Sequence, residues 1–415
     1  MSSWLTIFEY IVIKTIGVCL DPLFWTIMLL VAWQYWQARK RQKAMFGVVT
    51  FSMRQHLGYM FLYGLVGGLL GGALLALLGV SFNAMGFSYV WPLAVLLMIA
   101  SARFICFAYA GGLVALSSAI LGWPVVNVPH LLSLVAVLHV VESVLIVLSG
   151  RYGDLPSFLR RRDGRVVGAF QLQNFWPLPL VLLMAVAVPA GEARGLTLGA
   201  SWWPVLPLGL EAPAGQHWLY GLLPVVAALG YADMAVTEPP AQRRWRTAVQ
   251  LLAYSLLLLA LAVASAWLHW LQPVAALLAP VGHEWLIMKG NRRETRGKPF
   301  YVPPANGVMV LDTVLDSPAR AAGLRSGDIL LRVDEQDISS GAELGEALLR
   351  AGSTARLQWL REEVELQKEL PLPENGRLGV ILVPEGGERN VAELTEERFP
   401  WQDWWEKRKK GKSFE

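Results

Sequence analysis

The chain has 415 residues, of which 54% are hydrophobic and only 16% are charged, and its mean hydropathy is +0.42. This composition is too apolar for an ordinary soluble protein, so we expect a membrane protein with no nucleic-acid partner. Residues 1–283 carry 16 Lys and Arg against 9 Asp and Glu, whereas residues 284–415 carry 20 against 23. The change predicts an α-helical polytopic membrane domain over 1–283, followed by a small α+β domain that begins near residue 284.

Apolar segments recur throughout residues 1–283. A bilayer core about 30 Å thick takes roughly 20 apolar residues per helix. About eight spans are predicted on this basis, at 22–37, 57–80, 89–102, 104–122, 130–149, 174–191, 217–234 and 248–271. The segments 4–20 and 272–288 contain charged residues or prolines, and they raise the number of membrane segments to ten at most.

Three segments between the predicted spans are rich in Lys and Arg: 38–43, 151–165 and 241–246. Positive charge resists translocation, so all three should face the cytoplasm. With the spans as predicted, the chain leaves residue 271 on the outer side of the membrane. Segment 272–288 therefore decides which compartment holds the C-terminal domain, and loop charge alone leaves that side open.

A run of glycines, GLVGGLLGG, occupies residues 64–72 and places Gly64, Gly68 and Gly72 on one helical face. Small residues at this spacing let helices approach closely within a bilayer. We expect tight helix packing within the chain, and a homodimer contact is the alternative.

Two ionisable residues, His139 and Glu142, lie inside the apolar segment 130–149. At a spacing of three they share one helix face and can bond to each other. A self-satisfied polar pair is the simplest interpretation. The alternative is a proton or ion relay in a membrane enzyme or transporter, which would also use Asp233, because charged groups in lipid are costly.

Metal and catalytic signatures are weak. The sequence HEWLI at 283–287 has Ile287 where a metalloprotease HExxH motif needs its second histidine. The two cysteines, Cys19 and Cys106, lie far apart in apolar segments, which indicates two buried small side chains rather than a disulfide or metal site. We therefore predict no catalytic residues, no metal and no cofactor.

The C-terminal region is predicted as alternating strands and short helices. Residues 307–335 form a strand, a proline-started helical turn and a second strand; 339–352 form a serine-capped helix; a hairpin turns near Glu362; and 377–384 form a last strand. The order of SPARAAGL, GDILLRVD, helix and hairpin resembles that of bacterial PDZ domains. We place this domain, with its lead-in, at 284–385.

The resemblance to PDZ domains implies a peptide-binding groove between a strand edge and a helix. Its carboxylate-binding loop would be a hydrophobic-Gly-hydrophobic sequence, and the helix 340–351 would form the facing wall. The residues implied are Arg377, Leu378, Gly379, Val380, Ile381, Gly341, Leu344, Gly345 and Leu348. A plain core strand is the alternative for residues 378–381, because Val and Ile suit any buried strand.

The whole chain resembles MinJ-like proteins of Gram-positive bacteria. The resemblance is carried by LDPLFW with YWQARKRQKAMFG, by GHEWLIMKGNRRE and by LGVILVP. It implies a non-enzymatic membrane adaptor in division-site selection, which links DivIVA-like and MinD-like partners and other divisome proteins. It further implies location in the cell membrane at the division septum and poles, with the PDZ domain in the cytoplasm. An extracellular PDZ domain that senses envelope peptides is the alternative.

A tail at 386–415 combines Trp401, Trp404 and Trp405 with a cluster of lysines and arginines. Aromatic and basic side chains together suit the surface of an anionic membrane leaflet. A solvated, disordered tail is the alternative.

Overall fold

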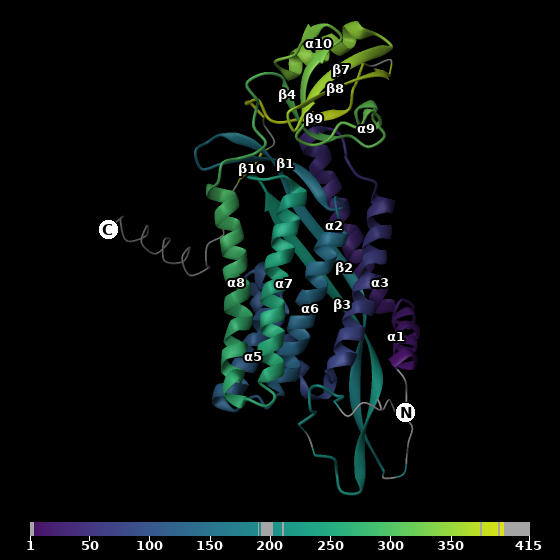
Figure 1. Ribbon diagram of the computed structural model, residues 1–415, viewed down its shortest axis with the longest axis vertical. Helices are drawn as coiled ribbons and strands as arrows, with labels where there is room; N and C mark the ends of the chain where they lie inside the picture. Colours follow the sequence, from purple (N-terminus) through teal and green to yellow (C-terminus); the bar gives the residue numbers. More distant parts are fainter. Residues whose placement is uncertain are drawn as a thin grey trace, which may run out of the picture.

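The computed structural model describes residues 4–189, 191, 202–209, 211–373, 376–388 and 391–393. A long body of helices surrounds a two-stranded ribbon, and a compact α+β domain caps one end of that body (Figure 1). The Trp- and Lys-rich residues of the predicted tail, 401–415, lie outside the described residues.

Eight α-helices make up the described part of the body. They are α1 (Trp4–Val18), α2 (Pro22–Phe46), α3 (Met53–Leu78), α4 (Phe87–Ala100), α5 (Phe107–Leu121), α6 (Val128–Leu148), α7 (Pro240–Ala264) and α8 (Gln272–Arg296), with short 3-10 turns η1 (Phe82–Ala84), η2 (Ala102–Ile105) and η3 (His269–Leu271). Among the described residues, α3, α6 and α7 are long and apolar enough to cross a membrane. A fourth span is formed if α1 and α2, bent by 64° at their junction, act as one. The structure thus has fewer candidate spans than the eight expected. The difference arises because α4 and α5 are short and because two further predicted segments are not helices.

The segments 174–191 and 217–234 were predicted as helical spans, and that prediction is wrong. They lie in strands β2 (Val166–Pro189) and β3 (Gln216–Ala235), which pair antiparallel without a break from Phe170↔Ala235 to Pro189↔Gln216. Prolines at 177 and 179 explain the difference, since proline inside a helix removes a hydrogen bond and clashes with the preceding turn. In a strand, the backbone groups of residues i and i+2 point to the same edge, so both prolines can face one side of β2.

The glycine face of α3 packs against that edge of β2, so the predicted tight packing occurs within the chain, against a strand rather than a helix. A Cβ added at Gly64 would lie 2.1 Å from the Pro177 carbonyl oxygen, and one at Gly68 would lie 2.3 Å from the Pro179 carbonyl oxygen. The prolines lack the N–H groups that would otherwise point at α3 without an acceptor. Because β2 covers Gly64, Gly68 and Gly72 in this structure, this face packs within the chain, and a homodimer contact through it stays an untested alternative.

Helices α7 and α8 form an antiparallel hairpin closed by η3 (Figure 1). The Tyr254 hydroxyl of α7 donates to the Ala279 carbonyl of α8 at 2.6 Å. Helix α8 thus carries the chain back to the end of the body from which α7 started. It contains the whole segment 272–288 and also residues 284–296, which were predicted as the lead-in to the C-terminal domain.

The three basic segments lie at the end of the body that holds the C-terminal domain. Segment 38–43 is in the last turns of α2, 151–165 spans β1 (Asp154–Arg160), and 241–246 is in the first turns of α7 (Figure 1). An ion pair between Arg244 and Asp154 joins two of these segments, and the Phe46 and Phe158 rings, with centroids 4.9 Å apart, join α2 to β1.

The C-terminal domain is a sheet with two helices. Its elements are β4 (Val308–Thr313), α9 (Pro318–Ala322), β5 (Ile329–Val333), β6 (Gln336–Asp337), α10 (Gly341–Ala351), β7 (Thr354–Arg361), β8 (Val364–Pro371) and β9 (Val380–Leu382). The strand order is β8-β7-β5-β4-β9, with β6 paired to β5. After β9 the chain returns to the body, where β10 (Ala392–Glu393) pairs parallel with β1.

Candidate functional site

A groove of about 670 Å³ lies between β9 and α10. The nine residues that the PDZ resemblance singles out are all brought together around it: Arg377, Leu378, Gly379, Val380, Ile381, Gly341, Leu344, Gly345 and Leu348. The first five come from β9 and the loop before it, and the other four come from one face of α10.

Strand β9 is at the edge of its sheet. Among the described residues it pairs with β4 alone, through Val310↔Leu382, Asp312↔Ile381 and Thr313↔Val380, and its other side borders the groove. An edge strand offers backbone N–H and C=O groups to an added strand. The groove can therefore accept an extended peptide by strand addition, with side chains of α10 as the opposite wall.

The loop before β9 is held by hydrogen bonds from the body of the domain. The carbonyl oxygens of Leu378 and Gly379 accept from Ala319 N at 3.0 Å and Val314 N at 2.9 Å. Gly379 has φ +77°, and a Cβ there would lie 2.4 Å from the Ser317 Cβ. Both conditions require glycine at this position, so the backbone of the loop stays close to the groove floor.

Helix α10 starts at a fixed place beside the groove. The Ser340 hydroxyl oxygen accepts from Glu343 N at 3.2 Å, and the Glu343 carboxylate accepts from Ser339 N at 2.8 Å. The first bond caps the N-terminus of α10, and the second ties Glu343 to the residue before the cap. Gly341 N donates to the Glu385 carboxylate at 2.8 Å, which ties the start of α10 to the chain beyond β9. A Cβ at Gly345, in contrast, would meet nothing within 4 Å.

The groove has a third wall, which the sequence analysis missed. Phe46 and Val48, at the end of α2 and just beyond it, and Phe158 of β1 line it together with the C-terminal domain. These residues precede the domain by more than a hundred positions, and no local pattern marks them. A peptide in the groove would thus contact both the C-terminal domain and the body.

The C-terminal domain is docked on the body through Tyr301, which is fully buried. Gly168 N of β2 donates to the Tyr301 carbonyl at 3.0 Å, and Ser326 Oγ donates to the Tyr301 hydroxyl at 2.9 Å. A Cβ at Gly168 would lie 2.9 Å from the Tyr301 Cβ and 3.0 Å from Leu311 Cδ1. The close approach fixes the position of the groove relative to β1 and β2.

Buried carboxyl groups flank this junction. Burial raises the pKa of Asp154 to about 6, although the adjacent Arg244 guanidinium opposes the shift. Burial likewise raises the pKa of Asp312 in β4, where the Thr313 N–H bond acts in the opposite direction. The two carboxyl groups interact electrostatically with each other and with Tyr301, whose pKa is raised mainly by burial and further by Asp154 and Asp312.

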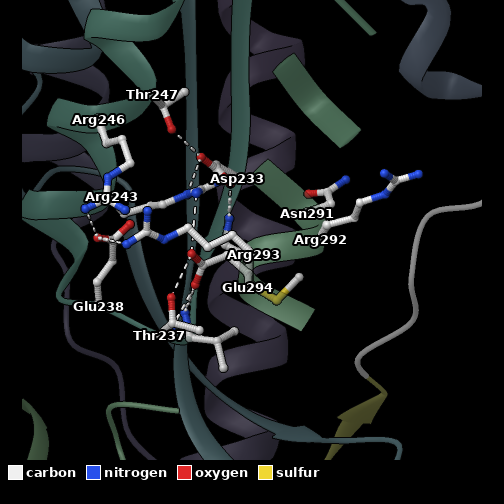
Figure 2. Close-up of polar contacts among 12 residues, drawn as sticks. Asp233, Thr237, Glu238, Arg243, Arg246, Thr247, Asn291, Arg292, Arg293 and Glu294 are labelled. Atoms are coloured by element: carbon white, nitrogen blue, oxygen red, sulfur yellow. Dashed lines mark hydrogen bonds and ion pairs between the residues drawn. The ribbon is translucent and has the colours of Figure 1, made fainter. Parts of the chain in front are cut away.

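A network of ion pairs and hydrogen bonds joins α7 and α8 at the end of their hairpin nearest the PDZ domain (Figure 2). Arg243 of α7 donates to both oxygens of Asp233, at 2.9 and 2.8 Å, and contacts Glu294 of α8 at 3.3 Å. Glu294 also accepts from Val236 N and Thr237 N, each at 2.8 Å. Asp233 therefore belongs to a structural network that joins β3, α7 and α8, apart from His139 and Glu142 in α6.

His139 has partners other than the predicted Glu142. Its Nδ1 lies 2.7 Å from the Val135 carbonyl oxygen, and its Nε2 lies 3.2 Å from Cys106 Sγ. The ring of His283, from the motif rejected as a metalloprotease site, lies with its centroid 5.1 Å from that of His139. No local sequence pattern marks this cluster, because its three members are widely separated along the chain.

Residues 288–372 match the PDZ domain family. The chain is 24% identical to the cell division topological determinant MinJ of Bacillus subtilis, over 89% of this chain and 94% of that protein. A 60-residue segment is 37% identical to the putative serine protease HhoA of Synechocystis, and it covers 14% of this chain and 15% of HhoA. The PDZ domain of an SdrC-like protein from Listeria monocytogenes is 22% identical, covering 19% of this chain and 90% of that one, with a TM-score of 0.17.

Proposed function

Because the chain is MinJ-like over most of its length and carries a C-terminal PDZ domain, we propose that it is a membrane-anchored adaptor in division-site selection. In this role the apolar helices hold the protein in the membrane, and the PDZ domain recruits other proteins to the division site. The adaptor is non-enzymatic. Its activity is the binding of peptide segments in the groove between β9 and α10.

The observation that carries the proposal is the groove itself. It combines a free strand edge, a glycine loop held beside that edge, and a helix wall with an open position at Gly345. These are the parts that strand addition of a peptide requires. Arg377, at the loop, supplies positive charge for a terminal carboxylate.

The adaptor faces the cytoplasm in this proposal. The basic segments 38–43, 151–165 and 241–246 lie at the PDZ end of the body, and such segments stay on the cytoplasmic side of a membrane. Because α8 brings the chain back from residue 271 to that end, the PDZ domain lies on the same side as the basic segments in this proposal. The alternative of an extracellular peptide sensor would require all three basic segments to be translocated.

The partners we propose are a DivIVA-like polar protein and a MinD-like ATPase, together with other divisome proteins. The third wall of the groove, formed by Phe46, Val48 and Phe158, restricts which peptides fit. Because these aromatic and aliphatic side chains adjoin the groove, we expect a partner segment with hydrophobic side chains beyond those that contact β9 and α10. Such a segment would be bound close to the membrane surface.

The test blocks the groove with the Gly345→Phe substitution and uses Gly345→Ala as the matched control. Nothing lies within 4 Å of a Cβ at this position, so both variants should fold, and the phenylalanine ring should fill the groove. Labelled C-terminal peptides of each proposed partner are titrated against the full-length protein in detergent. The same peptides with amidated ends test the requirement for a carboxylate.

We expect binding to wild type and to Gly345→Ala, and a loss of at least tenfold in affinity with Gly345→Phe or with amidated peptides. In cells that lack the native copy, Gly345→Phe should remain in the membrane and fail to recruit its partners to the septum. Equal peptide binding and equal recruitment by Gly345→Phe and Gly345→Ala would contradict the proposal.

A further inference from the structure

We propose that Cys106, His139 and His283 bind one transition-metal ion of the zinc type inside the helical body. Cys106 precedes α5, His139 lies in α6 and His283 lies in α8. One sulfur or nitrogen atom of each residue falls within 4.8 Å of the others. Thiolate and imidazole are ligands that Zn²⁺ favours. The site is independent of the peptide groove and of the proposed adaptor function.

His139 is held in the tautomer that a metal requires. Its Nδ1 lies 2.7 Å from the Val135 carbonyl oxygen, which can only accept, so Nδ1 carries the proton. The lone pair of Nε2 is then free, and this atom lies 3.2 Å from Cys106 Sγ. At metal sites the ring nitrogen of histidine that does not bind the metal commonly donates to a backbone carbonyl, which fixes the orientation of the ring.

His283 is oriented in the same way by a longer chain of contacts. The Tyr109 hydroxyl lies 2.6 Å from Glu284 Oε2 and 3.3 Å from His283 Nδ1. Because the hydroxyl donates its proton to the carboxylate, its lone pair accepts from His283 Nδ1–H, and Nε2 remains for a metal. Arg103 in turn donates to Glu284 Oε1 at 2.7 Å, which holds the carboxylate in place.

The spacing suits a tetrahedral ion after a small adjustment. With Zn–S and Zn–N bonds of ordinary length, the sulfur and nitrogen ligands of a tetrahedral site lie about 3.6 Å apart and two nitrogens about 3.3 Å apart. The distance of 3.2 Å from Cys106 Sγ to His139 Nε2 is close to the sulfur–nitrogen value. No two ligand atoms of the cluster are more than 4.8 Å apart, so side-chain rotations of about an ångström bring all three to tetrahedral spacing. A fourth position remains for water or an added ligand.

The charges around the cluster also favour a cation. The sulfur of Cys106 lies at the N-terminus of α5, where it accepts from Ala108 N at 3.4 Å, and a cysteine that binds zinc does so as a thiolate. A divalent ion with one thiolate keeps one positive charge. Glu142 lies one turn after His139 on α6, and its carboxyl group can supply the compensating negative charge if metal binding ionises it, in a medium where uncompensated charge is costly.

A bound ion would tie α8 to α5 and α6 near the middle of α8. Because α8 is the helix that leads into the C-terminal domain, the ion would fix the packing of this helix within the body. The sequence predicts no metal site, because HEWLI lacks the second histidine of an HExxH motif and the two cysteines lie far apart. In the proposed site the second histidine comes from α6 and the thiol from the residue before α5.

The test uses Cys19→Ser as the background, because Cys106 is then the one remaining thiol of the chain. The full-length protein carries a tag without histidines, and it is purified in detergent and stripped with a chelator. It is then titrated with Zn²⁺ while the rate of Cys106 alkylation by a maleimide is measured, and with Co²⁺ while the absorption of a cobalt–thiolate bond is recorded. Metal content after dialysis is measured by mass spectrometry.

We expect about one Zn²⁺ per chain, at least tenfold slower alkylation when Zn²⁺ is present, and a cobalt–thiolate absorption band. The Cys106→Ser, His139→Gln and His283→Gln variants should each lose the bound metal, whereas His269→Gln, a histidine of η3 outside the cluster, should retain it. Alkylation of Cys106 that is unchanged by Zn²⁺ in the Cys19→Ser protein would overturn the proposal. Metal content that is equal in the cluster variants and in His269→Gln would overturn it as well.

Discussion

Replacing Arg243 by Met should destabilise the protein strongly. The Arg243 side chain is 5% exposed, and it lies between the carboxylates of Asp233, 7% exposed, and Glu294, 2% exposed (Figure 2). Methionine preserves most of the buried volume but leaves two carboxylates without their shared cation. Breaking a buried pair by removing one partner typically costs about 3–5 kcal/mol.

A surface pair of nearly the same length provides the control. Arg165 lies 2.7 Å from Asp163, compared with 2.8 Å for Arg243 and Asp233, but its side chain is 75% exposed. Ion pairs exposed to solvent contribute little to stability, because water screens their attraction. Arg165→Met should therefore change stability little, so the comparison isolates burial from distance.

The assay is reversible unfolding of the full-length protein in mixed micelles, followed by tryptophan fluorescence. At about 1.4 kcal/mol per tenfold change, the expected loss for Arg243→Met raises the unfolding constant by roughly a hundredfold to a few thousandfold. Equal shifts of the unfolding free energy in Arg243→Met and Arg165→Met would show that this network does not hold the hairpin together.

Three further changes have defined outcomes. Gly68→Ala should lower the midpoint of thermal unfolding because its Cβ meets a strand carbonyl at 2.3 Å, whereas Gly58→Ala on the same helix, with nothing within 4 Å, should not; equal midpoints would contradict the packing. Burial raises the pKa of Asp154 to about 6, so the folded state binds the proton more tightly than the unfolded state, and stability should fall as pH rises from about 4 to 6; Asp154→Asn should flatten that dependence in unfolding titrations. Gly379→Ala should weaken peptide binding at least tenfold in fluorescence titrations, because its φ of +77° and the contact with Ser317 at 2.4 Å both resist a side chain; unchanged affinity would show that the loop does not form the groove floor.

The PDZ elements were predictable because local patterns specify them. The proline-started turn at 317–324 and the serine-capped helix at 341–351 each carry their own boundary residues, and the structure places both within one or two positions of the prediction. The residues around Gly379 follow from the resemblance to PDZ domains, because their spacing within the domain is short. Their role in binding a peptide stays a prediction.

The β2–β3 ribbon was not recognised because hydropathy alone cannot distinguish a long buried strand from a helix. The signal that separates them is present at Pro177 and Pro179, whose spacing of two suits one edge of a strand and breaks a helix. The glycines of α3 belong to the same signal. Their partner is the backbone of β2, and a glycine pattern by itself does not say whether a helix or a strand approaches it.

The clusters that join distant segments could not be predicted from local patterns. Cys106 and His283 are separated in the chain by α5, α6, β1, β2, β3, α7 and the first half of α8, and only the packing of α8 against α5 and α6 brings them together. Phe46 and Phe158 reach the groove for a similar reason. In each case the contact depends on how the helices and strands are packed, and neither composition nor residue spacing predicts that packing.

The side of the membrane that holds the groove tests the account most directly, because it decides which partners can reach the PDZ domain. A fluorescent protein that folds only in the cytoplasm and an alkaline phosphatase that is active only outside are fused in turn after Glu415. We predict fluorescence with the first fusion and no phosphatase activity with the second. Phosphatase activity without fluorescence would place the PDZ domain outside the cell and contradict the proposed adaptor function.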